Sequence, residues 1–306
     1  MASGLSYDSH RGRAIAAAVS AVMTGTAYAT SAEMARFMGP FAGYAANRDA
    51  MLRVIRNHRR AAHGETTGYE DLAIRPVALD AAQCPDAPLV AADKQAWDRA
   101  LVLGEQHGFR NAQVSVIAPT GTIGLVMDCD TTGIEPDFSL VKFKKLAGGG
   151  YFKIINQTVP SALRTLGYDE PAIARIIAYA VGHGSLAKAP AINPETLAAR
   201  GFDQAAIERV EKSIGTAFDI RFAFSRYTLG DSFCRTVLDL DETALADPKL
   251  DVLARLGFSR SDIAAANLHA CGTMTVEGAP DLKPEHLAVF DCANPCGRDG
   301  TRYLSA

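Results

Sequence analysis

The segment from Gln113 to Gly124, which reads Gln-Val-Ser-Val-Ile-Ala-Pro-Thr-Gly-Thr-Ile-Gly, decides the fold class. Its first five residues are apolar and β-branched enough to predict a buried strand. The strand would lead through a tight turn into the start of a helix. Such a junction directs several backbone N–H groups the same way at the positive end of a helix, beside the hydroxyls of Thr120 and Thr122, and that arrangement suits a phosphate group.

Two simpler interpretations of this region remain open from the residues alone. The turn contains neither Gly-x-x-x-x-Gly-Lys nor Gly-x-Gly-x-x-Gly, so its threonines could serve only as helix caps. Asp128, Asp130 and Glu135 follow in a polar loop and could hold a metal ion. Because no histidine and no regular ligand spacing accompany them, we expect capping and turn roles instead.

Length and composition exclude several classes of protein. The chain has 306 residues, of which 48% are apolar and 21% are charged, so we expect one large domain or two modest ones with hydrophobic cores. The net charge of −3 gives the chain no overall attraction to nucleic acid or to an anionic membrane. Binding driven by overall charge to either partner is therefore excluded. No uninterrupted apolar run reaches the roughly 20 residues of a membrane span. We therefore expect a soluble globular protein.

The apolar run from Ala14 to Met23 follows basic residues and could be read as a signal sequence. We favour an amphipathic helix, because Ile15, Val19, Val22 and Met23 recur at the helical spacing that the inward face of a half-buried helix requires. Six cysteines scattered over a long chain do not make a disulfide framework, so reduced thiols in the cytoplasm are expected.

Asp8 or Ser9 is expected to cap a helix that runs through Met23, and Ser31 a second helix that runs through Phe37. Further helices are predicted over 48–60 and over 91–106, the latter ending at Gly108, and short strands over 138–143 and 151–155 with a break at Gly148–Gly150. Beyond residue 160 an internal repeat appears in Gly167-Tyr168-Asp169, Gly201-Phe202-Asp203 and Gly257-Phe258-Ser259, each with an isoleucine six residues after its glycine. The glycine would end one helix and the Asp or Ser would cap the next. Pro194–Ala198 and Pro284–Ala288 echo each other as well. Such repeats usually serve architecture or protein contact.

Together, the strings Ala118–Gly124, Met127–Pro136 and Lys142–Gly150 closely resemble the adenosylcobalamin-dependent (class II) ribonucleotide reductases. The resemblance continues in the segments 4–9, 29–34, 51–58, 110–115, 276–280 and 289–294, so it covers nearly the whole chain. These enzymes reduce ribonucleotides to deoxyribonucleotides for DNA synthesis by a radical mechanism.

The resemblance implies an α/β fold: a ten-stranded barrel built from two five-stranded parallel halves around a finger loop that carries the radical cysteine. The chain would be the C-terminal part of this catalytic barrel, incomplete and carrying a largely helical insertion. Residues 1–160 would form part of the barrel, 161–290 the helical insertion, and 291–306 a truncated return toward the barrel.

The resemblance also implies the site and its ligands. The phosphates of a ribonucleoside di- or triphosphate would be held by Pro119, Thr120, Gly121, Thr122, Ile123 and Gly124. Beside the same pocket would lie Gly133, Ile134, Glu135 and Pro136. The implied cofactor is adenosylcobalamin, and the implied enzyme class is ribonucleoside-diphosphate reductase.

The catalytic half of the family's site is not recognised. Its Asn-x-Cys-x-Glu motif should precede Pro119, where nothing matches, and Asn294-Pro295-Cys296-Gly297-Arg298 resembles it only in letters because an arginine replaces the acid. No catalytic residue is assigned. We expect a fragment that does not reduce nucleotides alone and that needs the missing barrel half or a second copy of the chain. The alternative is a non-catalytic interaction protein that binds a partner through the helical repeat.

A zinc site is a further alternative, built from Cys292 and Cys296 with His269, Cys271 and His286. The spacing fits no standard zinc motif. Free thiols and packed histidines are therefore expected, and no metal ligand is assigned.

Overall fold

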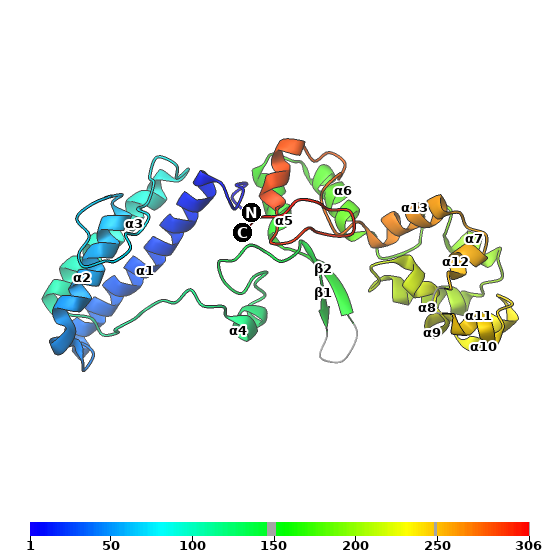
Figure 1. Cartoon of the computed structure of the whole chain (residues 1–306), viewed down its shortest axis with the longest axis horizontal. Helices are drawn as coiled ribbons and strands as arrows, with labels where there is room; N and C mark the ends of the chain where they lie inside the picture. Colours follow the sequence, from blue (N-terminus) through cyan, green and yellow to red (C-terminus); the bar gives the residue numbers. More distant parts are fainter. Residues whose placement is uncertain (146–150, 248–249, 306) are drawn as a thin grey trace. The chain divides into compact units, whose positions relative to one another are not determined.

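The computed structural model describes residues 1–145, 151–247 and 250–305. The break predicted at Gly148–Gly150 lies outside these residues. The chain divides into two compact units (Figure 1). The helical unit comprises Leu5–Thr122 and Thr132–Ile134, and the repeat unit comprises Met1–Gly4, Ile123–Thr131 and Glu135–Ala306. Each unit is considered by itself.

The helical unit contains α1 (His10–Met38), α2 (Tyr44–Ala62) and α3 (Ala87–His107). Ser9 caps α1 by accepting a hydrogen bond from the Gly12 amide, and Gly108 ends α3, both as predicted. The prediction of two helices before residue 38 is wrong. Ser31 does not cap a second helix; it is buried inside α1, and its hydroxyl donates to Asn111 Oδ1 at 3.1 Å.

The face of α1 that packs on α3 consists mostly of small residues, with Tyr28 as the large exception. Val19 and Met23, predicted to face inward, are 43% and 65% exposed, whereas Ala18 is fully buried. A Cβ on Gly25 would lie only 3.1 Å from Trp97, so the close approach of the helices selects small side chains. By length and composition alone α1 could cross a membrane, a property shared by core helices and signal sequences.

The repeat unit holds the one sheet seen among the described residues, a hairpin of β1 (Val141–Lys145) and β2 (Tyr151–Ile155). The strands pair antiparallel, with Val141 opposite Ile155. Both predicted strands are thus confirmed, the first beginning three residues later than expected.

The buried strand predicted at 113–117 is wrong. This segment is extended but lies outside any sheet, and Val116 and Ile117 are 76% and 65% exposed. A strand needs neighbours to satisfy its backbone groups, and β1 and β2 satisfy each other. The described residues are mostly helical, and their two strands pair antiparallel, whereas the barrel halves implied by the resemblance are parallel. The ten-stranded barrel is therefore not seen in the described part of the chain.

The remaining helices follow in this order: α4 (Gly121–Val126), α5 (Thr158–Thr165), α6 (Glu170–Val181), α7 (Pro194–Ala198), α8 (Gln204–Ile214), the 3-10 helix η1 (Ile220–Phe224), α9 (Arg226–Leu229), α10 (Asp231–Thr236), α11 (Glu242–Ala246), α12 (Val252–Arg255), α13 (Arg260–Cys271) and the 3-10 helix η2 (Pro284–Phe290). The division between the two units falls inside α4.

The predicted repeat is confirmed. Asp169, Asp203 and Ser259 cap α6, α8 and α13 by accepting a hydrogen bond from a backbone amide in the first turn of each helix. Ile173, Ile207 and Ile263 are buried. The cap and the buried isoleucine recur in all three copies of the repeat. Each copy therefore stabilises its helix in the same way.

Two of the repeated elements are related by a constant offset. Both boundaries of α13 lie 90 residues after those of α6, from 170 to 260 and from 181 to 271. The turns that follow these helices exchange equivalent backbone hydrogen bonds. Thr273 N donates to Tyr179 O at 3.0 Å, and His183 N donates to His269 O at 2.8 Å. The two copies therefore pack as a local two-fold pair.

Candidate functional site

The predicted turn and the predicted loop meet through Thr120. Its amide and its hydroxyl both donate to Thr132 O, at 2.8 and 2.9 Å. Tyr7 adds a third segment, because its hydroxyl donates to Ile134 O at 2.8 Å. Residues far apart in sequence, all within the helical unit, are thus brought to one place.

The turn itself is open to solvent. Residues 119–123 are exposed and Gly124 is buried. Helix α4 begins at Gly121, so the amides of its first turn have no acceptor within the helix. The Thr122 side chain is exposed, whereas the Thr120 hydroxyl already donates its proton to Thr132 O. The backbone amides and Thr122 are therefore the groups on this turn that can meet an anion.

The other predicted residues divide between the units. Gly133 and Ile134 are exposed and belong to the helical unit with the turn. Glu135 is exposed and Pro136 is half-buried, and both belong to the repeat unit. The carboxylate of Asp130, in the preceding loop, accepts from the Gln157 amide at 3.1 Å, which is the kind of turn role predicted for it.

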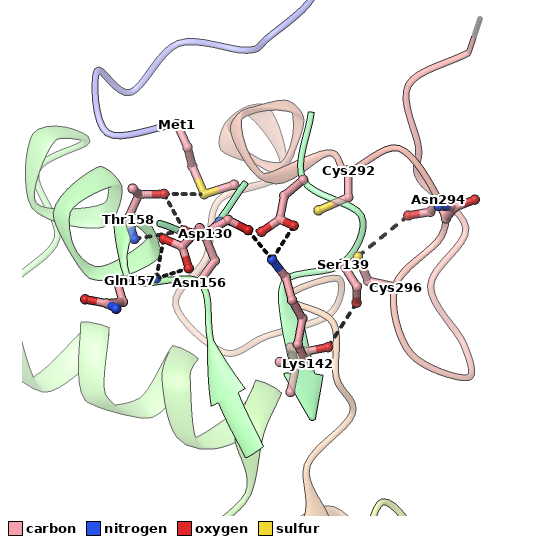
Figure 2. A network of polar contacts seen from close by, with 12 residues as sticks. Met1, Asp130, Ser139, Lys142, Asn156, Gln157, Thr158, Cys292, Asn294 and Cys296 are labelled. Atoms are coloured by element: carbon pink, nitrogen blue, oxygen red, sulfur yellow. Dashed lines mark hydrogen bonds and ion pairs between the residues drawn. The ribbon is translucent and has the colours of Figure 1, made fainter. Parts of the chain in front are cut away.

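The repeat unit contains a buried polar cluster that sequence reasoning missed (Figure 2). Asp137 is 7% exposed and pairs with Lys142 Nζ at 2.6 Å and with Asn156 Nδ2 at 2.5 Å. Lys142 Nζ also donates to Asp130 O at 2.7 Å. A buried carboxylate is stable only with such partners, so this cluster fixes the start of β1 against the end of β2.

Cys292 and Cys296 adjoin this cluster. Both thiols are free and buried, and their sulfurs lie near each other (Figure 2). Cys292 Sγ donates to Phe290 O and Cys296 Sγ donates to Asn294 O, each at 3.7 Å. The amide of Ala293, between them, donates to Asp137 O at 2.8 Å. The interaction with Cys292 lowers the pKa of Cys296 to about 6, helped by the Leu140 backbone and by Ser139 and opposed by burial. The same interaction and burial raise the pKa of Cys292.

The remaining residues weighed for zinc lie apart from these thiols. His286 is hydrogen-bonded to the Tyr168 hydroxyl at 2.7 Å, and His269 Nε2 lies 3.0 Å from Ala187 O. Throughout the described ranges, no three His, Cys, Asp or Glu side chains are grouped to hold a metal ion. Arg298 Nη2, in the Asn-Pro-Cys-Gly-Arg string, donates to Asp219 at 2.8 Å.

No local signal in the sequence could have found the polar cluster. Asp137 precedes β1, Lys142 lies in β1 and Asn156 follows β2, so the three residues form no continuous motif. The Cys-x-x-x-Cys spacing was visible and marked the thiol pair. Its neighbour Asp137 becomes evident only when the segment at 291–293 folds back onto the start of β1.

Comparison with known proteins gives the family. The model of the ribonucleotide reductase barrel domain matches residues 1–219. The vitamin B12-dependent ribonucleotide reductase of Agrobacterium fabrum is 65% identical over 305 residues, covering 100% of this chain and 24% of the relative. The protein of the same name from Bradyrhizobium diazoefficiens is 64% identical over the same shares.

More distant relatives match a smaller part of the chain. The protein of the same name from Streptomyces coelicolor is 50% identical over 195 residues, covering 64% of this chain and 19% of the relative. The chain spans about a quarter of the length of the two most similar relatives described above. The family match and these identities agree, and the chain belongs to the ribonucleotide reductase barrel-domain family.

Proposed function

We propose that this chain is part of a vitamin B12-dependent ribonucleotide reductase, which reduces ribonucleotides to deoxyribonucleotides by a radical mechanism, and that it supplies the substrate-phosphate site. Pro119–Gly124 would bind the phosphates, with Gly133–Pro136 beside them. The observation that carries the proposal is the solvent-exposed start of α4, held to the following loop by the two hydrogen bonds from Thr120 to Thr132 O.

The two threonines of the turn would have different roles. Thr120 donates its hydroxyl proton to Thr132 O and thereby sets the shape of the turn, so it is a positioning residue. Thr122 is exposed and would donate to a phosphate oxygen together with the first amides of α4. Such donors stabilise negative charge at a helix start. A ribonucleoside di- or triphosphate presents the necessary anion.

The exposed apolar residues around the turn support a larger assembly. Val116, Ile117, Val126, Met127 and Phe138 are between 65% and 82% exposed. Val116 and Ile117 belong to the helical unit and the other three to the repeat unit, so each set is considered by itself. In each unit, large apolar side chains in water are typical of a surface that another element covers. We propose that these side chains pack under the remaining strands of the ten-stranded barrel, supplied by the rest of the enzyme or by a second copy of the chain.

Within that enzyme, residues 1–160 would belong to the barrel, 161–290 to a helical insertion and 291–306 to the return toward the barrel. Adenosylcobalamin would be the cofactor, as the names of the relatives imply, and the enzyme would act in the cytoplasm. The described residues do not themselves fit a corrinoid. Val116 and Ile117 lie in an extended segment and Val126 lies in α4, and none of them lines the best-formed cavities of the described residues.

No step of the chemistry is therefore assigned to this chain beyond holding the substrate. The chain alone should not reduce nucleotides when it is supplied with adenosylcobalamin and a dithiol. Deoxyribonucleotide formation by the purified chain would contradict the proposal that this chain only holds the substrate.

Calorimetric titration tests the phosphate site. The chain should bind a ribonucleoside diphosphate and should not bind the same nucleoside without phosphates. Thr122→Val should weaken binding about tenfold, because one hydrogen bond to a charged group is lost. Thr66→Val, which alters an exposed threonine elsewhere in the helical unit, should bind like the wild type. Equal heats for nucleoside and nucleotide would contradict the proposal.

A further inference from the structure

We propose that Cys292 and Cys296 form a reversible disulfide, a redox site distinct from the proposed phosphate turn. The two thiols lie beside each other next to Ser139 and Lys142 (Figure 2). They are separated by three residues in a segment without helix or strand, so the backbone between them can adjust to a sulfur–sulfur bond.

This pair differs from the other cysteines in its surroundings. Cys234 and Cys271 are buried within α10 and α13, and Cys129 is exposed in a loop. Cys292 and Cys296, by contrast, lie in one irregular segment with their sulfurs near each other (Figure 2). This placement favours a disulfide between these two cysteines.

The two sulfurs are also unequal, as thiol–disulfide exchange requires. Cys296 lies beside Ser139, with its thiol donating to Asn294 O at 3.7 Å (Figure 2). Its neighbours Cys292, Leu140 and Ser139 lower the pKa of this thiol and so favour its thiolate. Cys292 Sγ is fully buried and keeps its proton more tightly. Since the thiolate is the attacking species, Cys296 would react first and Cys292 would resolve the intermediate.

The oxidant would be a small-molecule disulfide. The Cys296 thiolate attacks one sulfur of this disulfide, forming a mixed disulfide and releasing one small thiolate. The released thiolate takes the proton of Cys292. The Cys292 sulfur then attacks Cys296 Sγ and releases the second thiolate, which takes up the proton given off by Cys296. In total, two protein thiols are oxidised and one small disulfide is reduced to two thiols.

Access depends on the segment that covers the pair. Arg302 Nε and Nη2 donate to the Asp291 carboxylate at 2.8 and 2.7 Å, and the Thr301 amide donates to Glu277 at 2.9 Å. The hollow beside Cys296 measures about 10 Å³, too small for a disulfide reagent. The reaction therefore needs these contacts to open, and opening should limit its rate.

The test incubates the purified chain with oxidised glutathione, alkylates the remaining thiols and maps the products by mass spectrometry. We expect a peptide cross-link between Cys292 and Cys296 that a dithiol reverses. Cys292→Ser should stop at glutathione attached to Cys296. Arg302→Ala should form the cross-link at least several-fold faster, whereas Arg164→Ala, which removes an exposed arginine paired with Glu170, should not.

Glutathione attached to Cys129 alone, in both the wild type and Arg302→Ala, would overturn the proposal, and so would a wild type that retains glutathione on Cys296 without closing the disulfide. If Cys292→Ser does not fold, the cross-link in the wild type and its rate in Arg302→Ala still decide the question. None of these readouts depends on nucleotide binding, so they are independent of the proposed function.

Discussion

Gly182 and Gly272 lie back to back at the local two-fold axis of the repeat. A Cβ on Gly182 would come within 2.4 Å of Ala270 O, and a Cβ on Gly272 would come within 2.4 Å of Gly182 N. Both glycines also have positive φ, at 77° and 68°. The contact between the two copies thus requires a glycine on each side, for its lack of a side chain and for its backbone conformation.

Substitution at this contact should be severe. Gly182→Ala and Gly272→Ala should each lower the free energy of unfolding by about 3 kcal/mol, because overpacking and a positive φ both oppose the methyl group. The double variant should cost less than the sum, since one contact is shared. Urea denaturation measures all three.

Two other glycines provide the matched control. Gly167 and Gly257 also have positive φ, but a Cβ at either would meet nothing within 4 Å. Gly167→Ala and Gly257→Ala should therefore cost only about 1 kcal/mol from backbone strain. Equal losses of unfolding free energy at all four positions would show that packing between the two copies does not contribute to stability.

Lys153 joins the hairpin to both copies of the repeat. Its Nζ donates to Val181 O at 3.1 Å and to Cys271 O at 2.6 Å, which are the last carbonyls of α6 and α13. A cation at a helix C-terminus is stabilised by the helix dipole. Lys153→Met should lower the free energy of unfolding by about 2 kcal/mol, since two charge-assisted hydrogen bonds are lost.

The comparison for Lys153 is an exposed lysine of the same unit. Lys212 lies near the end of α8 with its side chain in solvent, and Lys212→Met should change stability by less than about 0.5 kcal/mol. If thermal unfolding shows the same change in stability for both variants, the hydrogen bonds from Lys153 to the ends of α6 and α13 do not stabilise the repeat.

Asp93 should make the stability of the helical unit depend on pH. Its carboxylate is fully buried in α3 with no hydrogen-bond partner in the part of the chain that the structure describes, and burial raises its pKa to about 6, opposed by Lys94. The folded chain therefore keeps a proton that the unfolded chain loses near pH 3.8. The free energy of unfolding should fall as the pH rises from about 4 to about 6.

Asp93→Asn should remove most of this slope and should stabilise the unit at pH 7 by roughly 2 kcal/mol, because no charge is then buried without a partner. Asp49→Asn, at a side chain that is 98% exposed, serves as the control. Chemical denaturation at pH 4, 5, 6 and 7 gives the comparison. A wild type with the same slope as Asp93→Asn would contradict the assignment to Asp93.

Local signals predicted the parts of the fold that local interactions determine. The caps at Asp169 and Ser259 and the end of α3 at Gly108 each depend on a few neighbouring residues, so the sequence marked them correctly. The segment at 113–117 was predicted wrongly because a strand depends on partners elsewhere. Ser31 was misassigned because its role in α1 depends on Asn111, 80 residues away.

The same distinction applies to the candidate sites. The turn at Pro119–Gly124 could be named from a continuous string of residues. The cluster around Asp137 could not, because Lys142, Asn156 and Ala293 reach it only after the hairpin and the C-terminal segment have folded. Its members carry no motif of their own.

Amide chemical shifts, followed by NMR while the chain is titrated with a ribonucleoside diphosphate, test the central claim most directly. The account predicts saturable shifts centred on the amides of Gly121, Thr122 and Ile123, much weaker shifts with the unphosphorylated nucleoside, and a reduced response in Thr122→Val. Shifts that leave these three amides unchanged, or that are equally large with the nucleoside, would contradict the claim that this turn binds the phosphates.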